Sequence, residues 1–425
     1  MTCHESTRRT GMSDTPPKTP GGEHIFPLQE ADRCVMCGMC LAHCPTYLKH
    51  REEGESPRGR IALMVALASQ RLAPSPNLHI HLDQCLVCRA CERVCPSKVP
   101  YGRLIDAGRA LTRPTLLRRL LRITLLDGLI AHPHWLQRFA GLLYRLQQWG
   151  LIHPLARLVG LQRLAALLPK LSAPTPLQPH YPARGIERGR VALFVGCVTG
   201  VLDRETIASA LQVLTQLGFS VDVPPKQTCC GALHQHNGAL VGAERLLQQN
   251  QAAFSGTQWD AILSVASGCG ATLAEYPAGA SAPPVMDISD FLSRASWPEG
   301  VQLRTLEKRV VVHDPCSLVN VLRQAAGPYA VLRRIPGLTV LPLGGNHQCC
   351  GGAGSALLTA SSLTRALQAD KVAALREMNA DFLVSSNLGC VLHLAEGARA
   401  AQISVEVMHP VTLLARCLED GRGVT

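Results

Sequence analysis

Short apolar runs alternate with helical patterns over the C-terminal half of the chain. Six such runs, each of a length typical of a buried strand, lie at residues 191–195, 220–223, 261–265, 310–312, 338–341 and 382–385. After the first run, Ile207, Leu211, Leu214 and Leu217 recur at helical spacing and stop at Gly218, as at many helix ends. Strands that alternate with helices predict parallel sheets.

The first 190 residues have a different pattern. Residues 57–60 lead into an apolar stretch at 61–67 that predicts a helix. A basic, leucine-rich region follows at 114–170, with helical spacing at 116–122, and we expect Pro133 and Pro154 to divide it into three helices. Four prolines between 172 and 182 predict a semi-extended linker. No uncharged apolar run approaches the roughly 18 residues needed to cross a bilayer.

Sixteen of the eighteen cysteines fall into two duplicated patterns, and Cys3 and Cys417 stand outside them. The first pattern, C-x2-C-x2-C-x3-C-P, occurs as Cys34, Cys37, Cys40, Cys44 and Pro45, and again as Cys85, Cys88, Cys91, Cys95 and Pro96. The second pattern occurs as Cys197, Cys229, Cys230 and Cys269, and again as Cys316, Cys349, Cys350 and Cys390. Its members are offset by 119 to 121 residues, so two similar halves are expected.

The first pattern predicts two [4Fe-4S] clusters. Two intervening residues let three thiolates of one loop reach one cluster, and in chains with two such motifs the fourth cysteine ligates the other cluster. We therefore expect one cluster on Cys34, Cys37, Cys40 and Cys95, and the other on Cys85, Cys88, Cys91 and Cys44. Structural zinc is the rival, but zinc sites usually pair two C-x2-C knuckles and need no third cysteine.

The second pattern indicates a metal site in each half, at the ends of the expected strands. Gly231 and Gly351 are expected to permit the tight turn that directs two adjacent thiolates at one site. Each half offers four cysteines, enough for one further iron–sulfur cluster, and a buried pair of free cysteines is the alternative. Four histidines near these loops are candidates for tuning, ligation or proton transfer, or for ordinary hydrogen-bonded roles: His234, His236, His313 and His347. Arg58 and Arg60 either offset cluster charge or form an exposed loop pair.

Taken together, these patterns predict an α/β protein with an N-terminal α-helical two-cluster ferredoxin-like domain and duplicated C-terminal α/β halves with parallel sheets. The expected segments are a disordered N-terminus (1–24), the ferredoxin-type domain (25–112), the basic helical region and linker (113–189), and the two Cys-Cys-Gly domains (190–300 and 301–425). The length of 425 residues predicts two or three domains.

Charge and composition limit the kinds of partner that the chain is expected to bind. The formal net charge is +11, and fourteen Lys or Arg lie between Tyr101 and Arg190 against three acidic residues. Such a stretch fits an anionic membrane surface, an acidic partner subunit or an ordinary solvated helical face. Nucleic acid is not expected, because no nucleic-acid-binding motif accompanies the charge and aromatic residues make up only 4%. The polar residues 1–22 lack an apolar signal segment, so cytosolic surroundings are expected, where cysteines bind metals rather than form disulfides.

These motifs resemble the iron–sulfur subunit of glycolate oxidase (glycolate dehydrogenase), within the wider group of Cys-Cys-Gly and heterodisulfide reductase-related proteins. The resemblance lies in residues 34–45, 56–61, 82–96, 229–232, 266–270, 349–354 and 387–390. One departure from the heterodisulfide reductases is that Ala266 and Asn387 stand where those proteins carry a fifth cysteine.

The resemblance implies an electron-transfer role without a catalytic residue in this chain. FAD-binding partner subunits would oxidise glycolate to glyoxylate, and this chain would pass the electrons singly to a quinone or another membrane acceptor, peripherally at the inner face of the cytoplasmic membrane. The alternatives are the same role for D-lactate, another 2-hydroxy acid or glycerol 3-phosphate, and a thiol–disulfide reductase at Cys229 and Cys230 or Cys349 and Cys350.

Overall fold

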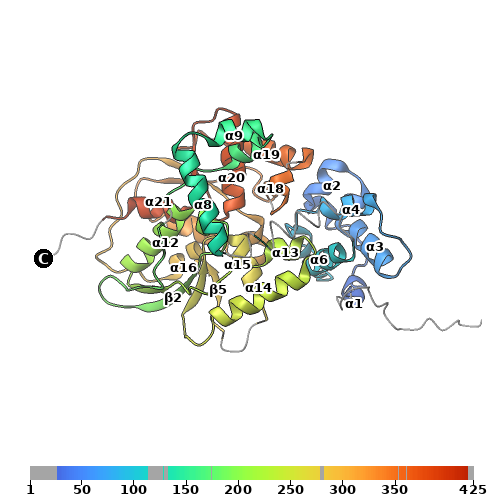
Figure 1. The fold of residues 1–425 in the computed structure, drawn as a ribbon, viewed down its shortest axis with the longest axis horizontal. Coiled ribbons are helices and arrows are strands. Elements are labelled where there is room, and N and C mark those ends of the chain that lie inside the picture. Colours follow the sequence, from blue (N-terminus) through green and yellow to red (C-terminus); the bar gives the residue numbers. More distant parts are fainter. Residues whose placement is uncertain are drawn as a thin grey trace, which may run out of the picture.

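The computed structural model describes residues 26–112, 128, 133–173, 175–277, 282–352, 354–359 and 361–419. The disorder expected at 1–24 and the helix expected at 116–122 lie outside these residues. Figure 1 shows the N-terminal helices, in blue, as a lobe beside the larger α/β part of the molecule.

The N-terminal lobe is helical, as expected. Its helices are α1 (Leu28–Ala31), α2 (Pro45–His50), α3 (Pro57–Ala68), α4 (Pro76–Asp83), α5 (Ala90–Arg93) and α6 (Tyr101–Leu111). Helix α3 begins where the sequence predicts, because Pro57 occupies its first turn and the Ser56 hydroxyl accepts a hydrogen bond from the Gly59 amide. Met64 of α3, Leu82 of α4 and Leu104 of α6 are completely buried in the core of this lobe.

The described part of the leucine-rich region contains three helices: α8 (Pro133–Gln148), α9 (Ile152–Leu158) and α10 (Gln162–Leu167). The first of the three expected helices, before Pro133, lies outside the described residues, and Pro154 does not make the next break. Pro133 starts α8, and Pro154 lies in the first turn of α9, where the missing amide hydrogen costs nothing. The helices end instead at Gly150 and Gly160, which adopt the left-handed conformation with φ of 69° and 72°.

Each C-terminal half contains a sheet with three neighbouring parallel strand pairs. In the first half, the strand order is β1-β3-β2-β4-β5, and only β1 runs antiparallel. These strands are β1 (His180–Tyr181), β2 (Gly189–Phe194), β3 (Phe219–Asp222), β4 (Ala261–Ser264) and β5 (Val285–Asp287). The second half repeats the arrangement as β7-β6-β8-β9, with β6 (Arg309–His313), β7 (Thr339–Pro342), β8 (Phe382–Ser385) and β9 (Glu406–Met408). The six strands read from the sequence are confirmed, and β1, β5 and β9 are additional.

The helices of the two halves follow the strands. The first half has α11 (Thr199–Leu202), α12 (Arg204–Gln216), α13 (Ala232–His236), α14 (Leu240–Ala253), α15 (Ser267–Ala274) and α16 (Ile288–Arg294). The second has α17 (Ala326–Leu332), α18 (Ala356–Thr359), α19 (Ser362–Arg376), α20 (Leu388–Ala400) and α21 (Pro410–Cys417), with a π-helical turn at Leu318–Leu322. No helix among the described residues is long and apolar enough to span a membrane.

The two halves share one large hydrophobic core, and each also has a smaller buried cluster of its own. Val191 and Leu263 of the first sheet, Val310 and Val384 of the second, and Val411 of α21 belong to the same buried cluster. Helix α21 packs against α12, and the Thr206 and Thr412 hydroxyls are hydrogen-bonded at 3.1 Å. The duplicated cysteine loops are therefore held in a fixed mutual arrangement.

The N-terminal lobe contacts both halves through polar groups. Arg109 of α6 donates a hydrogen bond to the His236 carbonyl oxygen of the first half, and Asp106 accepts one from the Gln235 amide. On the second half, Lys49 of α2 forms an ion pair with Asp370 at 2.7 Å. These contacts place the ferredoxin-type loops against the Cys-Cys-Gly halves.

Candidate iron-sulfur centres

The two ferredoxin-type loops have the same unusual backbone. In the first motif, Met36 and Gly38 have φ of 56° and 84°, and at the equivalent positions of the second, Val87 and Arg89 have φ of 49° and 58°. A positive φ is strained for ordinary side chains and for the β-branched Val87 in particular, and such strain persists where the surroundings hold a functional loop. Both loops are thus curled in the same way around their cysteines.

The second ferredoxin-type site gathers the four cysteines expected from the exchange of fourth ligands. Cys44, from the first motif, lines one cavity together with Cys85, Cys88 and Cys91. Burial raises the pKa of Cys91 well above its ordinary value, and the neighbouring thiolates of Cys88, Cys85 and Cys44 raise it further. Four soft thiolates around one cavity fit an iron–sulfur cluster, whose positive iron would remove this mutual repulsion.

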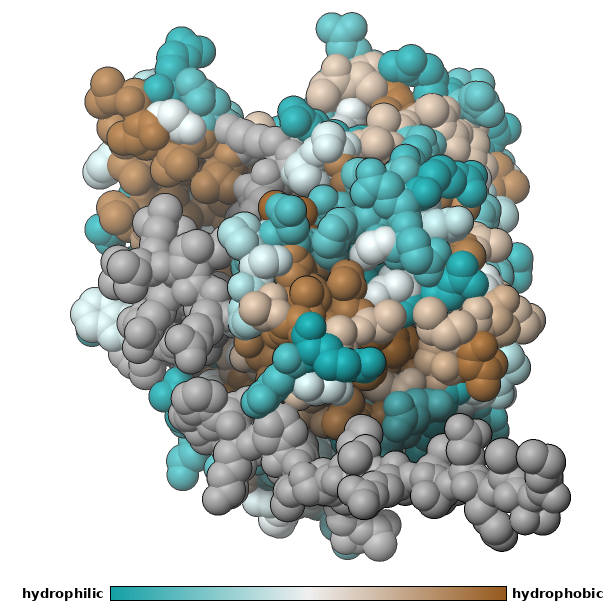
Figure 2. Space-filling model, turned by 90° about the vertical axis from the view of Figure 1, so that its right-hand side faces the viewer, coloured by the Kyte–Doolittle hydropathy of each residue, from teal (hydrophilic) through white to brown (hydrophobic). Residues whose placement is uncertain are grey.

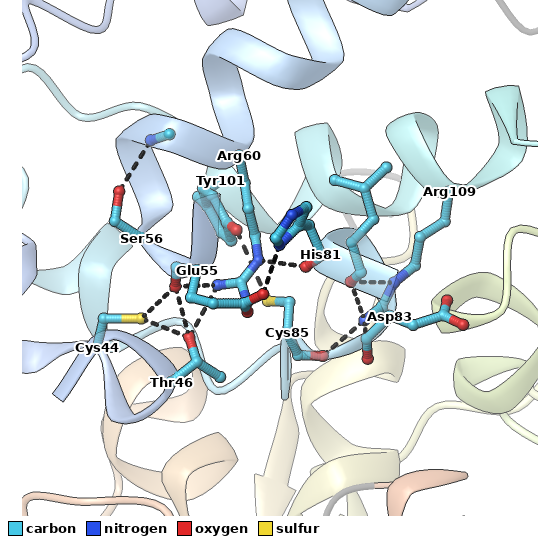
Figure 3. Close-up of polar contacts among 12 residues, drawn as sticks. Cys44, Thr46, Glu55, Ser56, Arg60, His81, Asp83, Cys85, Tyr101 and Arg109 are labelled. Atoms are coloured by element: carbon cyan, nitrogen blue, oxygen red, sulfur yellow. Dashed lines mark hydrogen bonds and ion pairs between the residues drawn. The ribbon is translucent and has the colours of Figure 1, made fainter. Parts of the chain in front are cut away.

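A completely buried arginine stands beside this site (Figure 3). Arg60 donates to the Thr46 hydroxyl at 2.9 Å, to the Glu55 carbonyl oxygen at 2.6 Å and to the His81 carbonyl oxygen at 2.7 Å, and it pairs with the Glu55 carboxylate. The Cys44 sulfur lies 3.1 Å from the Thr46 hydroxyl. Arg60 is therefore no part of an exposed loop, and its charge lies close to the thiolates that it can offset.

The first ferredoxin-type site lies at the surface. Cys37 is exposed. The other three cysteines of the site are partly covered and pack against the core of the lobe: Cys34, Cys40 and Cys95. Burial raises the pKa of Cys40 to about 11. Arg58 holds the loop by donating to the Met36 carbonyl oxygen at 2.9 Å while it pairs with Glu53.

The surface around this first site is apolar. Val35 and Met39 flank Cys37 and are 68% and 58% exposed. A hollow of about 420 Å³ beside them is lined partly by Cys34, Met36 and Ile61. Figure 2 looks onto this side of the molecule and shows hydrophobic residues gathered among hydrophilic ones. An exposed apolar patch beside a redox site is typical of a surface where a partner docks.

In the first Cys-Cys-Gly half, the four cysteines form a chain of sulfur contacts. The Cys197 and Cys229 sulfurs are 3.4 Å apart. Hydrogen bonds from the Cys229 and Cys269 thiols hold the pKa of Cys230 well below its usual range. At Gly231, where a tight turn was predicted, the backbone is left-handed, with φ of 83°. These loops leave the carboxyl ends of the parallel strands, where such sheets build their sites.

The second half repeats this arrangement with a cation added. The Cys350 and Cys390 sulfurs are 3.2 Å apart, and Gly351 has φ of 86°. Lys371 of α19 is buried beside them and donates to the Gly345 carbonyl oxygen at 2.6 Å. Burial lowers the pKa of Lys371, whereas the Cys350 and Cys349 thiolates oppose this effect. The lysine interrupts the apolar row Leu363, Leu367 and Leu375 at four-residue spacing, a signal that the sequence reading missed.

The second ferredoxin-type site adjoins the second Cys-Cys-Gly site. Cys88 and Cys316 pack against the small cluster that contains Leu86 and Cys349. Burial and then the Cys316 thiolate raise the pKa of Cys88 well above its ordinary value. The Asn320 side chain donates to the Cys88 carbonyl oxygen at 2.7 Å, across the contact between the lobe and the second half. Sequence spacing gave no indication of this contact.

Asn387, one of the two positions that lack a fifth cysteine, connects the two halves. The Asn387 side chain caps α20 by accepting from the Gly389 amide at 3.0 Å, and its amide group reaches the Ser267 hydroxyl at 3.3 Å. The Ser267 amide donates to the Ser386 carbonyl oxygen. These contacts of Ser267 hold the first half against the second.

The four candidate histidines occupy different environments. His234 is completely buried in α13, and His347 is exposed. His236 pairs with Asp106 at 3.0 Å, so it serves the contact with the N-terminal lobe. His313, at the end of β6, lies among the cysteines of the second half, and its ring nitrogen, Cys350 and Cys390 offer donor atoms within 4.8 Å of one another.

Comparison with known families agrees with this arrangement. The family model of the 4Fe-4S dicluster domain matches residues 30–99, and that of the cysteine-rich domain matches residues 191–274 and 310–395. The chain therefore carries iron–sulfur clusters, and its two halves are cysteine-rich domains.

Whole-chain relatives are similar along nearly all of their length. The chain is 32% identical to the probable glycolate oxidase iron–sulfur subunit of Bacillus subtilis, over 90% of this chain and 92% of that protein. It is 31% identical to the glycolate oxidase iron–sulfur subunit of Escherichia coli, over 91% of this chain and 94% of that protein. Lactate utilization protein A of Bacillus velezensis is 27% identical over only 53% of this chain. The chain belongs to the family of glycolate oxidase iron–sulfur subunits, which are electron-transfer subunits of oxidoreductase complexes.

Proposed function

We propose that this chain is the iron–sulfur subunit of a glycolate dehydrogenase complex. FAD-binding partner subunits convert glycolate to glyoxylate, a change that releases two electrons and two protons. The chain takes the electrons one at a time and delivers them to a quinone or another membrane acceptor. The whole-length similarity to two glycolate oxidase iron–sulfur subunits supports this proposal.

One observation carries the redox role: the cysteine sites form a series from the surface to the interior. Cys37 of the first site is exposed, the second site lies in the lobe's interior, and its Cys88 packs beside Cys316 of the second half. Iron–sulfur clusters at these cysteines supply one-electron carriers. The residues of this chain hold the carriers in order, exclude water from the inner ones and leave one open to a partner.

The apolar surface at Val35 and Met39 is our proposed docking site for the flavoprotein. Electrons would enter at Cys34, Cys37, Cys40 and Cys95 and continue to Cys44, Cys85, Cys88 and Cys91. From there the contact at Cys88 would carry the electrons to the second half. We propose that each of the two halves holds a further iron–sulfur centre.

Metal analysis and partner-dependent reduction test the proposal. The chain purified without oxygen should contain roughly eight irons for the ferredoxin-type sites, with more from the halves. Glycolate should bleach its absorption only when the flavoprotein partners are present. Glycolate oxidation by the chain alone would refute the division of labour, and bleaching by D-lactate but not by glycolate would refute the substrate.

The docking surface has its own test. Val35→Lys with Met39→Lys should slow glycolate-dependent reduction at least tenfold, because two charges would have to be buried against the partner. Ile80→Lys is a matched control, since Ile80 is an exposed apolar residue on α4 of the same lobe. Equal rates in the double variant and the control would contradict this docking site.

We further propose that helices α8 to α10 contact the membrane. Three exposed apolar residues of this segment are Trp135 of α8, Trp149 just after α8, and Leu158 of α9, and the last two are 68% and 84% exposed. Arg138 lies 5.3 Å from the centre of the Trp135 ring, and Arg145 is also exposed. Aromatic and aliphatic side chains among arginines are typical of helices that lie on an anionic bilayer. The basic residues Arg118, Arg119 and Arg122, from which the sequence also predicts this contact, lie outside the described residues.

Liposome flotation tests the membrane contact. The protein should float with vesicles that contain anionic lipid, and Trp149→Ser with Leu158→Ser should lower the recovered fraction at least threefold. Val241→Ser is the control, because Val241 is an exposed apolar residue on α14. Unchanged flotation of the double variant would refute the contact.

A further inference from the structure

The first difference between the duplicated halves lies at the strand end that precedes their first cysteine. Counting back from Cys197 and Cys316, the last residue of β2 is Phe194 and the last residue of β6 is His313. The two positions are equivalent in the sheets as well, because Phe194 pairs with Ser264 of β4 and His313 pairs with Ser385 of β8. A hydrocarbon ring in one half is thus replaced by an imidazole in the other.

His313 has the environment of a metal ligand. The side chain is buried, and its Nδ1 lies 3.0 Å from the Ser385 hydroxyl. Its Nε2 has no hydrogen-bond partner among the described residues. A histidine that binds a metal usually engages its second nitrogen in such a hydrogen bond, which fixes the tautomer and the orientation of the ring. A buried nitrogen without a partner costs stability unless something absent from the protein chain satisfies it.

A ring nitrogen of His313 lies among thiols. Of the residues that the structure describes, His313, Cys350 and Cys390 form the group whose three potential ligand atoms lie within 4.8 Å of one another. In the first half, Phe194 instead packs against Cys230, and Cys269 borders the same cluster. The first half therefore offers thiols alone at this place.

A second difference between the halves also makes the site of the second half more polar. Gly231 approaches Ala243 and Leu246 of α14, and Gly351 makes the equivalent approach to Thr364 and Leu367 of α19. By this correspondence, Asn250 of the first half occupies the position that is equivalent to Lys371 of the second half. The second site thus has a cation and an imidazole where the first has an amide and a phenyl ring.

We propose that Nε2 of His313 is a nitrogen ligand of the iron–sulfur centre in the second half, whereas the centre of the first half is held by thiolates alone. This inference rests on the proposed presence of a centre in each half. A neutral imidazole in place of an anionic thiolate makes a cluster easier to reduce. The second half, which adjoins Cys88, is then the stronger electron acceptor of the two.

Pulsed electron paramagnetic resonance tests the ligand without any substitution. The complete chain, grown with ¹⁵N-histidine and reduced stepwise, should show one cluster signal with a strong coupling to a histidine nitrogen. His313→Phe, which copies the first half, should abolish this coupling. Phe194→Leu is the matched control and should retain it. A wild-type protein without the coupling, or a coupling that survives in His313→Phe, would overturn the inference.

Two further variants separate ligation from simple packing. His313→Cys supplies a thiolate, so it should keep the iron that His313→Phe loses and lower the reduction potential of that centre. Ser385→Ala removes the hydrogen bond to Nδ1 and should weaken iron retention roughly tenfold. Equal iron content in His313→Phe and wild type, or equal loss in His313→Phe and His313→Cys, would contradict ligation.

Cys350→Ser distinguishes the two proposals. Loss of iron in this variant with unchanged iron in His313→Phe refutes the histidine ligand and leaves the second-half centre standing. Unchanged iron in Cys350→Ser refutes the second-half centre, and the histidine ligand with it.

Discussion

Replacing Arg60 by Met should destabilise the N-terminal lobe by about 3–5 kcal/mol, the usual cost of removing one partner from a buried ion pair. The guanidinium is completely buried and satisfies the carbonyl oxygens of Glu55 and His81, the Thr46 hydroxyl and the Glu55 carboxylate. Without it, the contact with His81 is the one that the Glu55 carboxylate keeps among the described residues. With a denaturant dependence of about 1.5 kcal/mol per molar, the urea midpoint should fall by about 2–3 M.

Urea unfolding, followed by circular dichroism and by the cluster absorption at roughly 400 nm, measures this effect. Arg58→Met is the matched control on the same helix: its partner Glu53 is half exposed, so solvent screens the pair and the midpoint should change far less. Adding Glu55→Gln to Arg60→Met should recover part of the loss, because the unpaired buried charge disappears. Equal midpoints for Arg58→Met and Arg60→Met would refute the reasoning.

Three other predictions concern single positions. Gly59→Ala should destabilise the lobe by about 1–3 kcal/mol in the same urea assay, because its new carbon would stand 2.0 Å from the Glu53 carbonyl oxygen; a wild-type midpoint would contradict this. Burial raises the pKa of Asp287 to about 7, so the folded protein binds this proton more tightly than the unfolded chain, and the contribution of Asp287 to stability is lost as pH rises from about 4 to about 7. Asp287→Asn should therefore be more stable than wild type at pH 8, by an amount on the order of 4 kcal/mol, and equally stable near pH 4; a difference independent of pH would exclude this cause. Lys371→Met should lower the reduction potential of the second-half centre in a redox titration, whereas Lys49→Met, which changes an exposed pair, should not.

The sequence was most informative where a local pattern dictates local geometry. Apolar runs of a length typical of strands predicted β2, β3, β4, β6, β7 and β8. The constant offset between the cysteines predicted the duplication. The glycines after the paired cysteines were expected to turn, and both have positive φ. Pro154 misled, because a proline in the first turn of a helix removes no hydrogen bond, and the break between α8 and α9 falls at Gly150 instead.

The sequence by itself determined the chemistry of this protein: sixteen cysteines at fixed spacings, repeated strands and the glycines that turn their loops. These features depend on the covalent spacing of ligands and on the backbone freedom of individual residues, which are local properties. Only the tertiary structure decided which sites are neighbours, since the contact of Cys88 with the second half and the burial of Arg60, Lys371 and His313 join residues far apart in the chain. Such contacts follow from how the lobe and the halves pack together, and packing is a property of the whole chain.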